Sequence, residues 1–221
     1  LGRVRESFRD RAFREYSLFF AAMQGAVGIS GPFFSVYMLN DLGYSYWQFT
    51  ANIGASILTQ FFTLSSWGYV CDRWGNRLVM VTSCCVLPVL PALWLFSDDF
   101  YYLLGVQVVS GLAWGGFSLS TSNYLFDLRP ARADFASYAA VQSSLSAIGV
   151  FFGALLGGYL AGALPHLLAL LPQSWQLAHS VVLIFATSAL LRVGIAAWFI
   201  PRSRELRVRQ RPDDGIHQQP R

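Results

Sequence analysis

The feature that most constrains this chain is a series of six long apolar runs joined by short polar connections. A helix needs about 20 apolar residues to cross the hydrocarbon core of a bilayer. Every run is near or above that length, so the pattern predicts an all-α membrane protein with six transmembrane helices. The spans, within several residues at each end, are Tyr16 to Leu39, Trp47 to Val70, Leu78 to Phe96, Tyr101 to Phe126, Tyr138 to Leu164 and Leu177 to Ile200.

The composition agrees with a lipid bilayer as the solvent. Hydrophobic residues make up 54% of the 221 residues and charged residues 13%, which is roughly half the charged share of a soluble domain. So few charges cannot cover a surface that faces water. One further apolar segment, Pro165 to Pro172, is too short to cross a membrane, and we expect it to form an interfacial turn between the fifth and sixth spans.

The positions of the arginines predict the orientation of the chain. All 16 basic residues are arginines, and fifteen of them lie at the two ends or in the connections after the second and fourth spans. Because short cytoplasmic loops retain positive charge, we expect both ends of the chain in the cytoplasm. The resulting division is a basic linker over residues 1–15, a transmembrane domain over 16–200 and an arginine-rich tail over 201–221.

No pattern in the sequence predicts an enzyme, a cofactor or a metal site. The three histidines lie in a loop, near a helix end or in the tail, and no nucleophile has a histidine at helical spacing. Cys71, Cys84 and Cys85 lack the paired spacing of a zinc site or a disulfide framework. Membrane topology already accounts for the arginines, so we expect lipid and not nucleic acid as the partner of this surface.

Glycines predict where the helices pack most closely. The fifth span has Gly149, Gly153 and Gly157 at a period of four, which makes a face that another helix can approach. In the first span, Gly31 and Pro32 are expected to kink or locally unwind the helix, because proline removes a backbone hydrogen bond.

Polar residues inside the spans predict either helix contacts or a water-filled cavity. On the fourth span they share one face, and on the first span Gln24 and Ser35 share another. The two faces together are our candidates for a substrate cavity. Those of the fourth span are Gln107, Trp114, Ser118 and Thr121.

Charged residues are almost absent from the middle of the spans. All 12 acidic residues lie in tails, loops or helix ends, so a proton-coupling carboxylate is not expected in this chain. The one charge within a span is Arg192, about two turns from Pro201. We expect its side chain to snorkel to the interface, and a contact with substrate in a cavity is the alternative.

The connection between the second and third spans carries a compact motif, Gly68-Tyr69-Val70-Cys71-Asp72-Arg73-Trp74-Gly75-Asn76-Arg77. A connection this short needs a residue that can adopt positive φ, which Gly75 supplies, and Gly68 would let a neighbouring helix come close. Asp72 can lie at a helix N-terminus. Arg73 and Arg77 can pair with acids at adjacent helix ends.

This motif resembles the loop signature of the major facilitator superfamily, with Asn76 in place of the first residue of its usual basic pair. The stretches from Gly31 to Leu39 and from Asn123 to Pro130 resemble helices of the C-terminal half in bacterial members, and the likeness extends from Phe13 to Arg202. The resemblance implies one half of a fold in which two six-helix halves surround a central cavity lined by the first and fourth helices of each half.

The resemblance also implies a latch at the cytoplasmic face. There Arg73 or Arg77 would pair with Asp127, and Asp72 with Arg132 or a helix N-terminus, beside Arg129. The fifth span lacks the glycine-proline pair of antiporter members, so antiport is not supported.

Two functions are consistent with these residues. The first is alternating-access transport of a small solute, with or without a coupling ion, in a bacterial inner membrane, together with an N-terminal six-helix half of the same polypeptide. The second is a six-span receptor, scaffold or assembly subunit that keeps the fold without transport.

Overall fold

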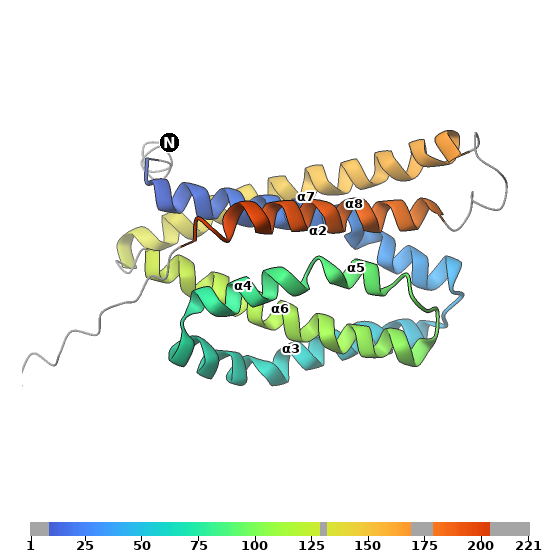
Figure 1. Ribbon diagram of the computed structural model, residues 1–221, viewed down its shortest axis with the longest axis horizontal. Coiled ribbons are helices and arrows are strands. Elements are labelled where there is room, and N and C mark those ends of the chain that lie inside the picture. Colours follow the sequence, from blue (N-terminus) through green and yellow to red (C-terminus); the bar gives the residue numbers. More distant parts are fainter. Residues whose placement is uncertain (1–8, 129–131, 169–178, 204–221) are drawn as a thin grey trace, which may run out of the picture.

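The computed structural model describes residues 9–128, 132–168 and 179–203, and within these the chain forms an elongated helical bundle (Figure 1). The described part contains no β-strand. Its elements in chain order are α2 (Arg11–Val36), the π-helix η1 (Tyr37–Asp41), α3 (Tyr46–Trp74), α4 (Asn76–Val86), α5 (Val89–Leu93), α6 (Phe100–Leu128), α7 (Arg132–Leu168) and α8 (His179–Phe199).

The predicted fold class, an all-α membrane bundle, is confirmed. Five helical stretches are long and apolar enough to cross a membrane: Arg11–Asp41, Asn76–Leu93, Phe100–Leu128, Phe135–Ala163 and Val181–Phe199. The remaining predicted span is α3, which has the necessary length with 29 residues but a more polar sequence. Asn52, Gln60 and Ser66 are among its polar residues.

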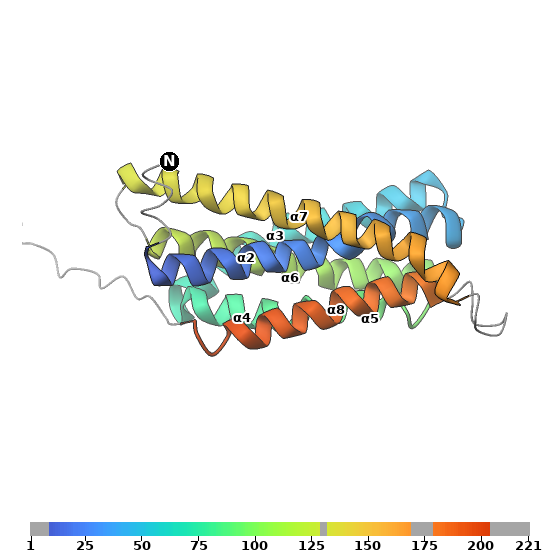
Figure 2. The same cartoon turned by 90° about the horizontal axis from the view of Figure 1, so that it is seen from above.

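The helices fall into two groups that lie side by side. One group contains α2, α7 and α8, and the other contains α3, α4, α5 and α6; the first lies above the second in Figure 1 and in front of it in Figure 2. Within the groups, α7 packs along α2 and α6 packs along α3. Contacts of α8 with α4 and α5 join the groups. The space between the two groups is where the cavities described below lie.

Local capping sets the start of two helices. The Asp10 carboxylate accepts the backbone N–H groups of Ala12 and Phe13 at 2.9 and 3.4 Å, so α2 begins at Arg11, before the predicted span. At α3, Ser45 and Gln48 form a capping box, in which each side chain bonds the backbone of the other. Both arrangements satisfy backbone donors that a helix start leaves free.

A single glycine connects α3 to α4. Gly75 has φ 93° and ψ 151°, a conformation that residues with a Cβ rarely adopt. The predicted need for positive φ at this position is therefore met. The turn lies at the end of the bundle where α2 begins and α6 and α8 end, and we call this the motif end; the opposite end, which carries Asp98, is the far end.

The third predicted span is interrupted. In place of one helix, α4 ends at Val86 and α5 runs from Val89 to Leu93. Pro88 and Pro91 cause the break, because neither residue has a backbone N–H to donate to the carbonyl four residues earlier. The carbonyl freed by Pro91 is that of Leu87, which is buried inside the bundle.

The first span does not unwind at the predicted place. The α-helix runs through Gly31 and Pro32 as far as Val36, and the departure from α-helical geometry comes afterwards, in η1. A π-helical turn shifts the hydrogen-bond pattern by one residue and so keeps the chain helical. Local unwinding at Gly31 and Pro32 is therefore wrong, whereas a kink in the continuous helix stays a prediction.

The fifth span is longer than expected. As helix α7 it has 37 residues and continues through Pro165 to Leu168. The predicted interfacial turn over 165–172 is thus helical in its first half, and its second half lies outside the described residues. The helix can pass Pro165 because it is close to the helix end, where lost backbone bonds are least costly.

The glycine face of α7 packs on α2. A Cβ added at Gly149, Gly153 or Gly157 would collide with the backbone carbonyl oxygen of Ala21, Gly25 or Ile29, respectively. A side chain at any of these positions would hold the two backbones apart. The helix that approaches the predicted glycine face is therefore α2 of the same bundle.

Candidate functional site: a polar groove and a second cavity

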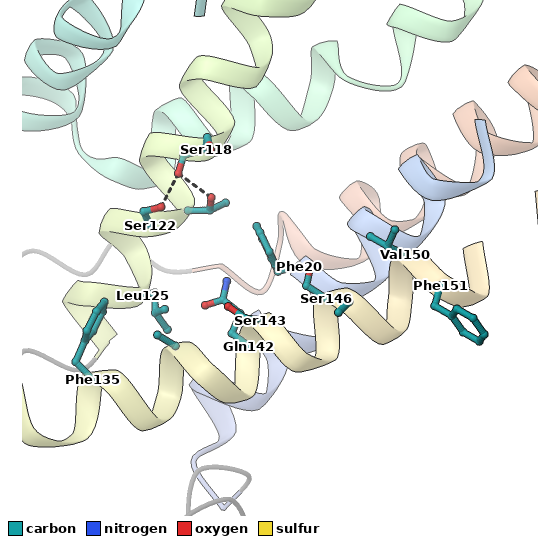
Figure 3. A pocket seen from close by; sticks show the side chains of 13 residues that line it. Phe20, Ser118, Ser122, Leu125, Phe135, Gln142, Ser143, Ser146, Val150 and Phe151 are labelled. Carbon is teal, nitrogen blue, oxygen red and sulfur yellow. Dashed lines mark hydrogen bonds between the residues drawn. The ribbon is translucent and has the colours of Figure 1, made fainter. Parts of the chain in front are cut away.

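A groove of about 700 Å³ lies between α6 and α7, in the half of the bundle nearer the motif end (Figure 3). Phe20 of α2 forms its floor together with apolar residues of both helices. None of the lining side chains in the described part is charged. The polar ones are Ser118, Thr121, Ser122, Gln142, Ser143 and Ser146.

One buried tyrosine joins the three helices that surround this groove. The Tyr16 hydroxyl of α2 donates to the Thr121 carbonyl of α6 at 2.6 Å and accepts from Gln142 Nε2 of α7 at 3.1 Å. Tyr16 is fully buried and Gln142 is 7% exposed. The other amide atom, Gln142 Oε1, is also buried but has no hydrogen-bond partner among the described residues.

Several hydroxyl groups of the groove are free to bind a guest. Thr121 and Ser122 donate to carbonyls one turn earlier in α6, at 2.6 and 2.8 Å. Ser118, Ser143 and Ser146 make no side-chain hydrogen bond to the described residues. With Gln142 Oε1 they provide both donors and an acceptor without any formal charge, which suits a neutral polar molecule.

Two of the predicted cavity residues, Ser118 and Thr121, line this groove. The residues of α7 were missed, because on the fifth span only the glycines were considered. A signal was present in the sequence: Gln142 and Ser146 precede Gly149 on the same helical stripe, with Ser143 beside them.

A second cavity, of about 250 Å³, lies farther toward the far end, between α2, α8 and the group of α3, α5 and α6. Three predicted cavity residues, Ser35, Gln107 and Trp114, line it. Most of the other lining residues are apolar, and they include Val27, Phe34, Met38, Ile53, Leu90 and Trp94.

A layer of contacting aromatic rings, Phe20, Phe117 and Trp114, runs from the lining of the groove to that of the second cavity. Phe20 stacks on Phe117 with ring centroids 5.9 Å apart, and Phe117 meets Trp114 edge to face at 5.8 Å. Gln24 lies on α2 between Phe20, which lines the groove, and Val27, which lines the cavity. The predicted polar faces are therefore divided between two compartments instead of lining a single one.

Arg192 does not snorkel to the interface. Its side chain is 3% exposed, lines the second cavity, and donates to the Leu87 carbonyl at 3.0 Å and to Ser30 Oγ at 2.9 Å. The Leu87 carbonyl is the one that Pro91 leaves without a helical donor, so it attracts the guanidinium inward. The snorkelling expectation is wrong for this reason, and the alternative of a cavity-facing arginine describes its position.

The motif end is held by an amide and not by the predicted arginine pairs. Asn76 Nδ2 donates to Asp127 Oδ2 at 2.7 Å, and Asn123 Nδ2 donates to Asn76 Oδ1 at 3.1 Å. Arg73 instead donates to the Tyr69 hydroxyl of its own helix at 3.2 Å. The predicted pairing of Arg73 or Arg77 with Asp127 is therefore wrong.

Arg77 binds the turn that directly follows α8. Its Nε donates to the Ser203 carbonyl at 2.9 Å and to Ser203 Oγ at 3.1 Å, and its Nη2 reaches the Ile200 carbonyl at 3.4 Å. Carbonyls at a helix end lack intrahelical donors, and a guanidinium satisfies them while favouring the negative end of the helix dipole. The sequence motif did not reveal this role.

The other motif residues that the structure describes make no contact of the predicted kind. Asp72 lies in the last turn of α3, exposed and without a hydrogen bond to the described residues, so the predicted place at a helix N-terminus is wrong. A Cβ at Gly68 would meet nothing within 4 Å, so no described helix approaches it closely. Arg129 and the side chain of Arg132 lie outside what the structure describes.

Tyrosines close the far end of the bundle. The Tyr37 hydroxyl donates to Asp98 Oδ1 at 2.8 Å, and the Tyr44 hydroxyl donates to the Asp98 carbonyl at 3.2 Å. Partial burial, together with the charges of Asp99 and Asp98, raises the pKa of Tyr44 above its usual value. These bonds tie η1 and the following loop to the connection before α6.

Comparison with known protein families identifies a match over most of the chain. The family model of the Major Facilitator Superfamily matches residues 16–221, which is nearly the whole chain. No curated protein and no solved structure matches.

Proposed function

Because the chain belongs to the major facilitator superfamily, we propose that it is the C-terminal six-helix half of a transporter that moves a small solute by alternating access. Membership of the family makes it a multi-pass membrane transporter protein. Beyond family membership, we propose that the chain is the C-terminal half, that it works by alternating access, and that the solute passes through the groove between α6 and α7. An N-terminal half in the same polypeptide would supply the opposite wall of the solute pathway.

The observation that carries the proposal is the uncharged, hydrogen-bonding groove between α6 and α7. Gln142 Oε1 is a buried acceptor without a partner among the described residues, and an unsatisfied buried acceptor costs about 1 to 3 kcal/mol. A solute hydroxyl or amide donating to this oxygen would remove that cost. The neighbouring Ser143 and Ser146 hydroxyls would supply further bonds, so a neutral polar solute fits this groove best.

The groove can be tested by substitution at Gln142. In the complete protein, Gln142→Leu removes the buried acceptor and the donor to Tyr16, and we expect uptake to fall by about tenfold or more, since one good hydrogen bond corresponds to that factor. The assay needs a transported solute, which is identified first by comparing the uptake of candidate neutral polar solutes in cells with and without the protein. Membrane insertion should be unchanged.

A matched pair of cysteines separates the groove from the outer surface of α7. Ser143 lines the groove, whereas Ser144 is exposed outside it and bonds the Ala140 carbonyl. In a protein without native cysteines, solute should protect Ser143→Cys, and not Ser144→Cys, from a thiol reagent. Wild-type uptake by Gln142→Leu, with equal labelling of both cysteines in the presence of solute, would show that this groove is not the solute pathway. Uptake no greater than in cells without the protein would favour the non-transporting subunit instead.

The orientation is part of the proposal and has its own test. Fifteen of the 16 arginines belong to the two ends or to the connections after the second and fourth spans, which supports a cytoplasmic motif end and insertion in an inner membrane. We expect a cysteine at exposed Trp74 to react with an impermeant reagent only from the cytoplasm, and one at Asp98 only from outside. The reverse labelling would contradict this orientation.

A further inference from the structure

Arg192 is a buried cation that lacks a negative partner in the described structure. It lies in the middle of α8, at a depth where a charge is costly unless it is paired. Its two bonded neighbours, the Leu87 carbonyl and Ser30 Oγ, are neutral. No carboxylate of the described residues lies within salt-bridge distance of the guanidinium.

The polar groups next to Arg192 form a further set of hydrogen bonds, and all of them are uncharged. Ser30 Oγ is 3.0 Å from Ser188 Oγ, and Ser188 donates to the Ala26 carbonyl at 2.6 Å. These bonds hold α2 and α8 together beside the broken α4 and α5 segment. They account for the position of the guanidinium, but they leave its positive charge uncompensated.

One donor of the guanidinium is unused and the side chain borders empty space. Arg192 Nε is buried and has no hydrogen-bond partner in the part of the chain that the structure describes. Arg192 lines the second cavity together with Ser35, Gln107 and Ser110. A guanidinium presents several donors in one plane and matches a carboxylate well. The cavity is near the small end of ligand sites, which fits a small guest.

We propose that this cavity binds a small monoanion, a carboxylate or an inorganic anion, against the unused donor of Arg192. Phe34, Leu90 and Trp94 would contact an apolar body attached to a carboxylate, while Gln107 and Ser110 can donate to its oxygens. The site is separate from the neutral groove, because the layer of Phe20, Phe117 and Trp114 lies between them. The inference therefore does not depend on which solute the groove accepts.

Binding can be measured without any transport assay. The complete protein, purified in detergent, is titrated with benzoate, with its neutral analogue benzamide and with chloride at constant ionic strength set by sodium sulfate, and thermal unfolding is recorded. We expect benzoate or chloride to raise the melting temperature saturably, as a ligand of the folded state does, and benzamide to have no such effect.

Three substitutions locate the site. Arg192→Gln should raise the half-saturating anion concentration about tenfold or more, since a charge-assisted bond is lost. The control Arg202→Gln removes an exposed arginine that contacts Trp198 at the end of the same helix, and should bind like wild type. Ser110→Leu narrows the cavity without touching the Arg192 contacts, so it tests the site even if Arg192→Gln does not fold.

The outcomes separate the sources of the anion. If benzoate raises the melting temperature of the wild type but not of Arg192→Gln or Ser110→Leu, the ligand is a carboxylate. If chloride does so and benzoate does not, the ligand is an inorganic anion. No saturable anion effect in wild type, or equal effects in wild type and Ser110→Leu, would overturn the proposal and leave Arg192 as a purely structural link. Anion binding without any solute uptake would instead count against the proposed transport function alone.

Discussion

Replacing Gly153 with alanine is expected to destabilise the bundle, although the same change usually stabilises a helix. The new methyl group would collide with the Gly25 carbonyl oxygen of α2. That atom belongs to a helix backbone and cannot rotate away as a side chain can. Overpacking of this kind costs about 1 to 3 kcal/mol, which outweighs the gain of up to about 1 kcal/mol in helix propensity.

Gly158 of the same helix is the matched control. A Cβ at Gly158 meets no atom of the described residues within 4 Å, so Gly158→Ala should be neutral or stabilising. The measurement is the free energy of unfolding of both variants in detergent micelles, in the complete protein. If the two alanines have equal effects, the close approach of α7 to α2 is not a determinant of stability.

Replacing Asn76 with alanine is expected to loosen the motif end. Asn76 donates to the Asp127 carboxylate and accepts from Asn123, so the change removes two hydrogen bonds and leaves a half-buried carboxylate without its donor. A bond to a charged group contributes about 1.5 to 3 kcal/mol and a neutral one about 0.5 to 1.5 kcal/mol. We therefore expect a loss of about 2 to 4.5 kcal/mol in unfolding free energy.

The control for this prediction is Asp72, the acidic residue of the same motif. Its carboxylate is exposed and makes no hydrogen bond to the described residues, so Asp72→Asn should change stability by no more than about 0.5 kcal/mol. In Asn76→Ala, a cysteine at Ser122 near the end of α6 should also become more reactive. A larger effect of Asp72→Asn than of Asn76→Ala would restore the arginine-centred latch implied by the family resemblance.

The comparison of the two motif residues shows what a sequence pattern can and cannot predict here. The position of Gly75 in a short connection between two apolar runs predicts a tight turn, because such a turn depends only on the backbone conformation of that residue. The partners of Arg73 and Arg77 depend on where the ends of α6 and α8 lie, and two arginines four residues apart do not encode that. Asn76, read in the sequence as a departure from the family pattern, is the residue that contacts Asp127.

The sequence predicts which helix faces of the candidate site are polar, but it does not predict how these faces are arranged in space. Helical spacing places Ser118 and Thr121 on one face, and both line the groove. The division into two compartments depends on Phe20, Phe117 and Trp114 meeting in the interior, which local spacing cannot reveal. Arg192 is similar. Its depth in α8 is evident from the sequence, but the free carbonyl that holds it is that of Leu87, in the break between α4 and α5.

By itself the sequence determined that this protein is a helical membrane bundle, where most of its spans lie and where its tight turn falls. These properties follow from the length of apolar runs, the distribution of arginines and the conformational range of glycine, all of which act locally along the chain. Only the tertiary structure decided that the α7 glycines pack on α2, that Asn76 and Arg77 secure separate helix ends, and that Arg192 lies buried beside a cavity. The physical reason is that close packing and buried hydrogen bonds join residues far apart in sequence, and their partners are selected only when the helices meet.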